Sequence, residues 1–100
     1  MDAPKIEAVV PLAGRRLRVT FVNGTQKVYD CTPLIGRDRF RLLKNEAFFK
    51  AVRVDVGGYG VSWSDECDLS EYELWVRGTS ANDTPTVWPS PDEKQALSSA

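Results

Sequence analysis

The chain has 100 residues, of which 42% are hydrophobic, and a formal net charge of −1. This length allows one domain with one modest core, and no apolar run reaches the roughly 20 residues of a membrane-spanning helix. The chain contains no histidine, which excludes Ser-His-Asp and Cys-His catalysis in cis. The N-terminus lacks the basic start and apolar run of a secretory signal, so we expect a cytoplasmic protein, without metal or cofactor.

Charge is divided unevenly along the chain. Residues 1–50 hold ten Lys/Arg and five Asp/Glu, whereas residues 51–100 hold three and nine. Folding can interleave the two halves, but the division is the main electrostatic indication of a partner surface. Cys31 and Cys67 belong to no CxxC pair, so we expect both to be reduced and to act as small apolar residues. A single disulfide or a reactive thiol is the alternative.

Two strands and a turn are predicted near the N-terminus, after a first short strand over residues 6–12. Residues 16–22 alternate, with Leu17, Val19 and Phe21 on one face. Asn23-Gly24 is typical of a tight primed turn between two strands.

The length of that turn decides the register of the returning strand. A loop of two or four residues places Val28 on the face of Val19 and Phe21, and Tyr29 on the outer face. By the same parity Asp30 points toward the core, where a carboxylate needs hydrogen bonds or a charged partner. Its position before Thr-Pro favours a turn in which it accepts backbone N–H bonds, over a functional acid.

Two short helices are predicted further along the chain. Asn45 is a candidate N-cap for a helix over residues 46–51. Residues 53–56 and 59–63 are expected to pair as strands across Gly57-Gly58. Ser70 and Glu73 have the spacing of a capping box, and this second helix is expected to end near Gly78.

The predicted fold is α+β: an antiparallel sheet of about four to five strands with two short helices packed on it. We assign residues 1–78 to a single compact domain. Residues 79–100 are rich in Ser, Thr and Pro and are expected to form a mostly flexible tail with an extended path. Trp88 is an apolar anchor in that polar tail and is suited to docking onto this domain or into the groove of a partner.

Several of these motifs follow one another in a set order. They are the strand–Asn23-Gly24–strand unit, the exit Asp30-Cys31-Thr32-Pro33-Leu34, the pair Phe48-Phe49, and the ending Trp63, Asp68-Leu69-Ser70 and Leu74. In this order they resemble the domain of unknown function 2442, a family of small bacterial proteins, over residues 5–77. The loop Ser64-Asp65-Glu66 departs from the Pro-Asn-Gly-type turn of that family.

This resemblance implies a compact domain with short helices on one side of an antiparallel sheet. Some members of the family carry an added helix-turn-helix domain, which implies transcriptional control, but residues 79–100 are too few and too proline-rich for one. Others are encoded beside a second small protein, in an arrangement similar to toxin–antitoxin pairs. The resemblance carries over no catalytic residue.

Two charged clusters are candidate sites. The acidic cluster has three possible roles: a metal or acid–base site, caps and dipole partners of a helix N-terminus, or an acidic face for a basic partner. Its spacing lacks the glycine and the regular alternation of ligands in a calcium loop, which favours the second role. The basic cluster suggests a partner surface or an ordinary solvated face. The acidic members are Asp65, Glu66, Asp68, Glu71 and Glu73, and the basic members are Arg15, Arg16, Arg18, Arg37, Arg39, Arg41 and Lys44.

We therefore expect a non-enzymatic protein-binding module with a regulatory or antitoxin-like role, whose partner is a small protein or a second copy of the chain. Four arginines are predicted to contact an acidic surface, together with Trp88 in a groove. The four are Arg16, Arg18, Arg39 and Arg41. One alternative is an accessory of a nucleic-acid-bound regulator, which the near-zero net charge disfavours. The other is an enzyme of unknown chemistry that uses Asp30 or Asp68.

Overall fold

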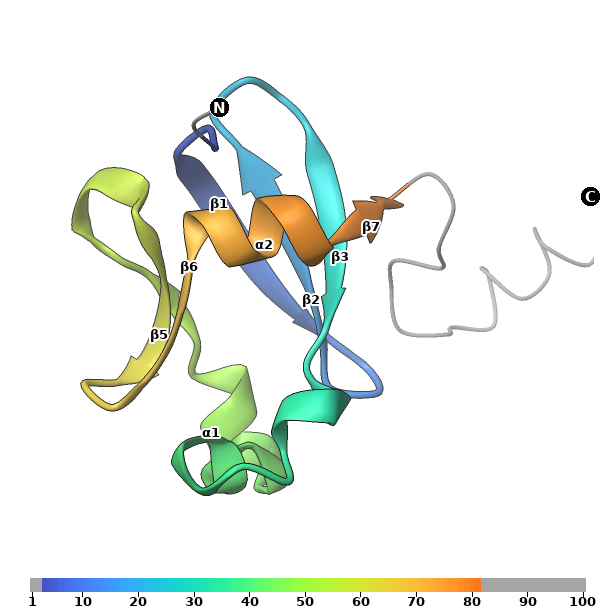
Figure 1. Ribbon diagram of the computed structural model, residues 1–100, viewed down its shortest axis with the longest axis vertical. Coiled ribbons are helices and arrows are strands. Elements are labelled where there is room, and N and C mark those ends of the chain that lie inside the picture. Colours follow the sequence, from blue (N-terminus) through green and yellow to red (C-terminus); the bar gives the residue numbers. More distant parts are fainter. Residues whose placement is uncertain (1–2, 82–100) are drawn as a thin grey trace, which may run out of the picture.

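The computed structural model describes residues 3–81, and in this range the chain forms two antiparallel sheets and five short helical segments (Figure 1). One sheet has the strand order β1-β2-β3-β7 and the other β4-β5-β6. The strands are β1 (Ile6–Leu12), β2 (Arg16–Phe21), β3 (Gln26–Asp30), β4 (Arg53–Val54), β5 (Gly60–Ser64), β6 (Cys67–Ser70) and β7 (Thr79–Ser80). The α-helices are α1 (Glu46–Lys50) and α2 (Glu71–Arg77), and the 3₁₀ helices are η1 (Thr32–Leu34), η2 (Asp38–Lys44) and η3 (Val56–Gly58). The α+β class is confirmed, and its strands are divided between two sheets.

The β2–β3 hairpin has a three-residue loop, Val22-Asn23-Gly24. The Gly24 N–H donates to the Phe21 carbonyl at 2.8 Å, and the Phe21 N–H donates to the Thr25 carbonyl at 2.8 Å. Only Gly24 has a positive φ, of 90°, as in a turn that is followed by a single left-handed glycine. The primed turn predicted here is therefore wrong, because it needs a positive φ at Asn23 as well.

The odd number of loop residues shifts the register by one. Leu17 pairs with Tyr29, and Arg18 pairs with Val28, so Tyr29 faces the core and Val28 the outer side of the sheet. Asp30 pairs with Arg16 on that outer side and is exposed. The predicted facing of Val28, Tyr29 and Asp30 is therefore wrong. The prediction assumes a loop of two or four residues, and a loop of three turns each residue of β3 to the opposite face of the sheet.

Both α-helices begin at the predicted caps. The Asn45 side chain accepts a hydrogen bond from the Phe48 N–H at 2.9 Å, and the Ser70 hydroxyl accepts one from the Glu73 N–H at 3.1 Å. Each cap satisfies one of the N–H groups that a helix start leaves unpaired. The predicted capping box also needs a hydrogen bond from the Ser70 N–H to the Glu73 carboxylate. That carboxylate turns toward β3 instead and accepts a hydrogen bond from the Tyr29 hydroxyl.

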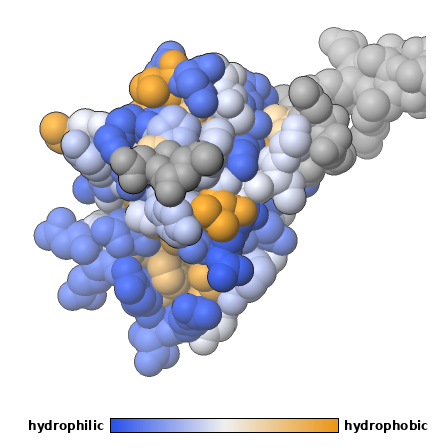
Figure 2. Space-filling view, turned by 45° about the horizontal axis from the view of Figure 1, so that its top comes forward, coloured by the Kyte–Doolittle hydropathy of each residue, from blue (hydrophilic) through white to orange (hydrophobic). Residues whose placement is uncertain are grey.

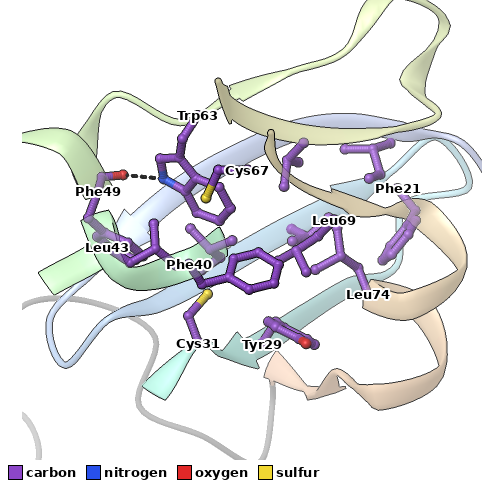
Figure 3. Packing of buried hydrophobic residues seen from close by; sticks show 14 residues of the cluster. Phe21, Tyr29, Cys31, Phe40, Leu43, Phe49, Trp63, Cys67, Leu69 and Leu74 are labelled. Carbon is purple, nitrogen blue, oxygen red and sulfur yellow. Dashed lines mark hydrogen bonds between the residues drawn. The ribbon is translucent and has the colours of Figure 1, made fainter. Parts of the chain in front are cut away.

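The main core lies between the two sheets and α2 (Figure 3). Leu17, Val19 and Phe21 are fully buried, as their alternation predicts. Trp63 stacks near Phe49, with ring centroids 6.0 Å apart, and its indole N–H donates to the Phe49 carbonyl at 2.8 Å. A buried indole N–H needs such a partner.

The two cysteines are part of this core. Cys31 and Cys67 are buried and free, as expected of small apolar residues. Burial raises the pKa of the Cys31 thiol to about 12, with a smaller contribution from the nearby Asp30 charge. Burial also raises the pKa of the Cys67 thiol. Both thiols are therefore protonated and poorly nucleophilic at neutral pH.

The turn between β4 and β5 brings backbone against backbone. Gly57 and Gly58 both have positive φ, of 83° and 76°. A Cβ at Gly58 would lie 2.6 Å from the carbonyl oxygen of Ile6, so the side-chain-free residue lets η3 pack against the start of β1. The predicted hairpin turn at these glycines is confirmed, and its two strands belong to the smaller sheet.

The larger sheet extends to Ser80, since Lys27 pairs with Ser80 and Val28 with Thr79. These two residues of β7 stand past the expected boundary at residue 78. Residues 82–100, with Trp88, lie outside the described part of the chain, so the predictions for them stay predictions.

On the face in Figure 2, apolar side chains occur in small separate patches among hydrophilic ones. Among the described residues, no helix is long and apolar enough to cross a membrane.

Candidate functional site

A groove opens near the end of β3, between η1 and α2. Its volume is about 470 Å³. That is within the range of about 300–1,000 Å³ that is typical of ligand sites. The lining residues are Tyr29, Asp30, Pro33, Leu34, Arg37, Glu73 and Arg77. They combine an apolar wall with charges of both signs.

One wall is held by a chain of polar contacts. The Tyr29 hydroxyl donates to Glu73 Oε2 at 2.8 Å, and Arg77 Nε lies 3.5 Å from the same oxygen. Burial and this hydrogen bond to Glu73 raise the pKa of Tyr29 above its ordinary value. The phenol is therefore a hydrogen-bond donor to α2 throughout the physiological range. Glu73 is engaged by two partners and contributes a fixed wall to the groove.

The opposite wall begins with a turn at Asp30. Its Oδ1 accepts hydrogen bonds from the Thr32 N–H at 3.0 Å and from the Thr32 hydroxyl at 2.6 Å. The predicted turn is thus confirmed, and this carboxylate stabilises the start of η1. Pro33 is exposed and Leu34 half-buried, so η1 presents an apolar surface to the groove.

Arg37 differs from the other charged residues of the groove. Its side chain is exposed and, within residues 3–81, has no hydrogen-bond or ion-pair partner. Glu73 and Arg77 pair with each other, and the Asp30 carboxylate accepts the two Thr32 hydrogen bonds while keeping its negative charge. Among residues 3–81, Arg37 is therefore the cation of the groove that has no partner, and its guanidinium is suited to a carboxylate or another bidentate acceptor.

Two of the predicted arginines adjoin the groove on the outer face of the larger sheet. Arg16 pairs with Asp30, which lines the groove, and Arg16 Nε also donates to the Ala13 carbonyl at 3.0 Å. Arg18 pairs with Val28 one row further along the same face.

Arg39 and Arg41 belong to η2 and have different surroundings. Arg39 Nη2 lies 3.1 Å from Asp68 Oδ1, and the Arg39 guanidinium lies over the Phe40 ring at 5.1 Å. Arg41 is exposed. Neither residue lines the groove. The contact that joins β2's start to η2 is made by Arg15, whose side chain donates to the Leu43 and Lys44 carbonyls at 2.8 Å each.

The acidic cluster is spread over separate contacts. Asp68 pairs with Arg39, Glu71 pairs with Lys5 at 3.7 Å, and Glu73 pairs with Tyr29 and Arg77. Within residues 3–81, no group of three Asp, Glu or Cys side chains is arranged to hold a metal ion. Glu71 and Glu73 stand in the first turn of α2, as helix-dipole partners do, but the cap itself is Ser70 and none of these three carboxylates.

The contact between Tyr29 and Glu73 is not predicted from the sequence because of one loop length. The expected loop puts Tyr29 on the outer face, away from Glu73, which is 44 positions further along the chain. The signal was present in Val22-Asn23-Gly24, because a glycine after two non-glycine residues also suits a three-residue hairpin loop. The sequence identifies Arg37 only as a member of the basic cluster.

The comparison with known families agrees with this fold. Residues 6–80 match the family described as "Protein of unknown function (DUF2442)". The match covers most of the chain, and the chain therefore belongs to this family. No curated protein and no solved structure shows a significant match to the chain.

Proposed function

We propose that the chain is a non-enzymatic protein-binding module with a regulatory or antitoxin-like role, and that the groove beside β3 takes part in binding. The observation that carries the proposal is Arg37, whose side chain has no partner within residues 3–81, beside the apolar surface of Pro33 and Leu34. A free guanidinium next to an apolar wall matches an extended protein segment that carries both an apolar and an acidic side chain.

The predicted arginines fit this proposal in different ways. Arg16 and Arg18 are proposed to form a second contact with an acidic partner, next to the groove. Arg16 is directly opposite Asp30, which lines the groove, in the pairing of β2 with β3. Arg39 and Arg41 are proposed to act on the side of η2. Exposed charges at the rim of an interface mainly change the association rate and its salt dependence, so their individual effects are expected to be smaller than that of Arg37.

The test is affinity capture from a lysate of the native host with the immobilised full chain, with and without nuclease. Wild type is compared with Arg37→Glu and with Arg53→Glu, a matched charge reversal at an exposed arginine outside the groove and outside the predicted partner contacts. We expect a small protein that survives nuclease, is recovered in stoichiometric amount, and is lost with Arg37→Glu but retained with Arg53→Glu. Loss of all captured material with nuclease would contradict the proposal and favour a nucleic-acid partner.

A further inference from the structure

The groove lies near the point where the described chain ends. β7 pairs with β3 through Lys27–Ser80 and Val28–Thr79, and the next residues of β3, Tyr29 and Asp30, line the groove. Successive residues of a strand are separated by about 3.3 Å. The groove therefore begins on the order of 10 Å along the sheet from Ser80, on the strand to which that residue is bonded.

Residues 82–100 have the length needed to reach it. Trp88 is eight residues after Ser80, and an extended chain of eight residues spans up to about 26 Å. That span allows the chain to turn back beside β3 and to place an indole at the groove. The prolines at positions 85, 89 and 91 favour extended backbone and reduce the conformational entropy lost on docking.

The charges of the two parts are complementary. Residues 3–81 hold twelve Lys/Arg and ten Asp/Glu, whereas residues 82–100 hold one lysine and three carboxylates, Asp83, Asp92 and Glu93. Asp92 follows Trp88 by four residues, which is about 12 Å in a polyproline-like path. An indole on Leu34 and Pro33 thus leaves Asp92 and Glu93 within reach of the long side chain of Arg37.

On these grounds, and building on the proposed function, we infer that residues 85–93 of the same molecule occupy the groove, with Trp88 on the wall of η1 and the Asp92-Glu93 pair beside Arg37. A partner protein then competes with this segment for the groove. A short tether gives an effective concentration on the order of millimolar, so a segment that binds with a Kd of about 0.1 mM occupies the groove in most molecules.

The inference is tested on the full chain by ¹⁵N NMR, with Trp88→Ala compared with wild type. We expect the backbone amides of Tyr29, Leu34 and Arg37 to shift in Trp88→Ala, by amounts that do not change with protein concentration. Arg37→Gln is expected to move the Trp88 indole N–H toward its position in a free peptide of residues 82–100. Val76→Ser, on the outward face of α2 where Tyr72 and Val76 are exposed, is the control and is expected to leave the indole unchanged.

A titration with that peptide supplies the quantitative result. Trp88→Ala, whose groove is vacant, is expected to bind the added peptide about tenfold more tightly than wild type does. Unchanged groove amides in Trp88→Ala overturn the inference, as do shifts confined to Tyr72 and Val76. Shifts that grow with protein concentration also overturn it, because they indicate docking between two copies.

These outcomes are separable from those of the proposed function. If groove amides do not shift in Trp88→Ala but partner capture depends on Arg37, the inference fails and the proposed function stands. If the amides shift but capture is the same for wild type and Arg37→Glu, the segment occupies the groove and the partner binds elsewhere.

Discussion

The Tyr29 hydroxyl donates a hydrogen bond of 2.8 Å to Glu73 Oε2, and so joins β3 to α2 across 44 positions of the chain. Glu73 is part of the first turn of α2, one residue before the fully buried Leu74. The bond therefore holds α2 against the end of β3. The wall of the groove that faces η1 depends on this contact.

Tyr29→Phe removes this donor and leaves the ring in place. We expect a loss of about 1–2 kcal/mol in the free energy of unfolding, since the acceptor is a carboxylate that keeps Arg77 as a partner. Urea denaturation of Tyr29→Phe, Glu73→Gln and the double variant measures the coupling between the two residues. Additive effects of the two single changes would contradict a direct contact.

Ser70→Ala tests the N-cap of α2. The change leaves the Glu73 N–H without its acceptor, and we expect it to lower the free energy of unfolding by about 1 kcal/mol. Ser70→Asp keeps an acceptor oxygen at the cap and is the matched control, for which we expect wild-type stability within about 0.5 kcal/mol. Equal losses in both variants would show that the cap bond does not stabilise the helix.

Gly58→Ala and Gly24→Ala separate backbone strain from steric contact. Both glycines have positive φ, but a Cβ at Gly58 meets the Ile6 backbone at 2.6 Å, whereas one at Gly24 meets nothing within 4 Å. We expect Gly24→Ala to cost about 1 kcal/mol. Gly58→Ala is expected to cost at least about 2 kcal/mol more, because overpacking adds to the strain. Thermal and urea unfolding give both values, and equal losses would contradict the close approach of η3 to β1.

The raised thiol pKa of Cys31 predicts a loss of stability in alkaline solution. The ordinary pKa is 9.0 and the folded value about 12, so between these values the folded chain holds a proton that the unfolded chain has released. The contribution is complete below pH 9 and is lost as pH rises toward 12, at up to about 1.4 kcal/mol per pH unit.

Cys31→Ala removes this slope and so provides the comparison. Urea denaturation at intervals from pH 8 to pH 10.5 is expected to show a shallower decline for Cys31→Ala than for wild type, although the variant is less stable at pH 8 through lost packing. Parallel declines of the two proteins would show that the thiol does not titrate differently in the folded state.

The predicted and observed folds differ where long-range geometry matters. Local signals placed β2, both helix caps and the glycine turn before β5, because each depends on residues close together in the chain. The four residues of β6 and the two of β7 gave no such signal. Short strands are defined by their pairing with β5 and β3, and their sequences alone carry little periodicity.

The candidate site depended on one further quantity, the number of residues in the β2–β3 loop. A change of one residue exchanged the faces of Tyr29 and Val28, and with them the contact to Glu73. Arg37 was recognised as basic from the sequence. Its lack of a partner among the described residues, in contrast to Arg39 beside Asp68, follows from tertiary packing that no local pattern specifies.

The central claim is that the groove beside β3 binds protein. The most direct measurement is the Kd of the captured partner for the wild-type chain, for Arg37→Ala and for Arg53→Ala, by isothermal titration at fixed salt. We expect a Kd about tenfold weaker for Arg37→Ala, which corresponds to about 1.4 kcal/mol, and a Kd within about twofold of wild type for Arg53→Ala. Equal affinities for wild type and Arg37→Ala would contradict it.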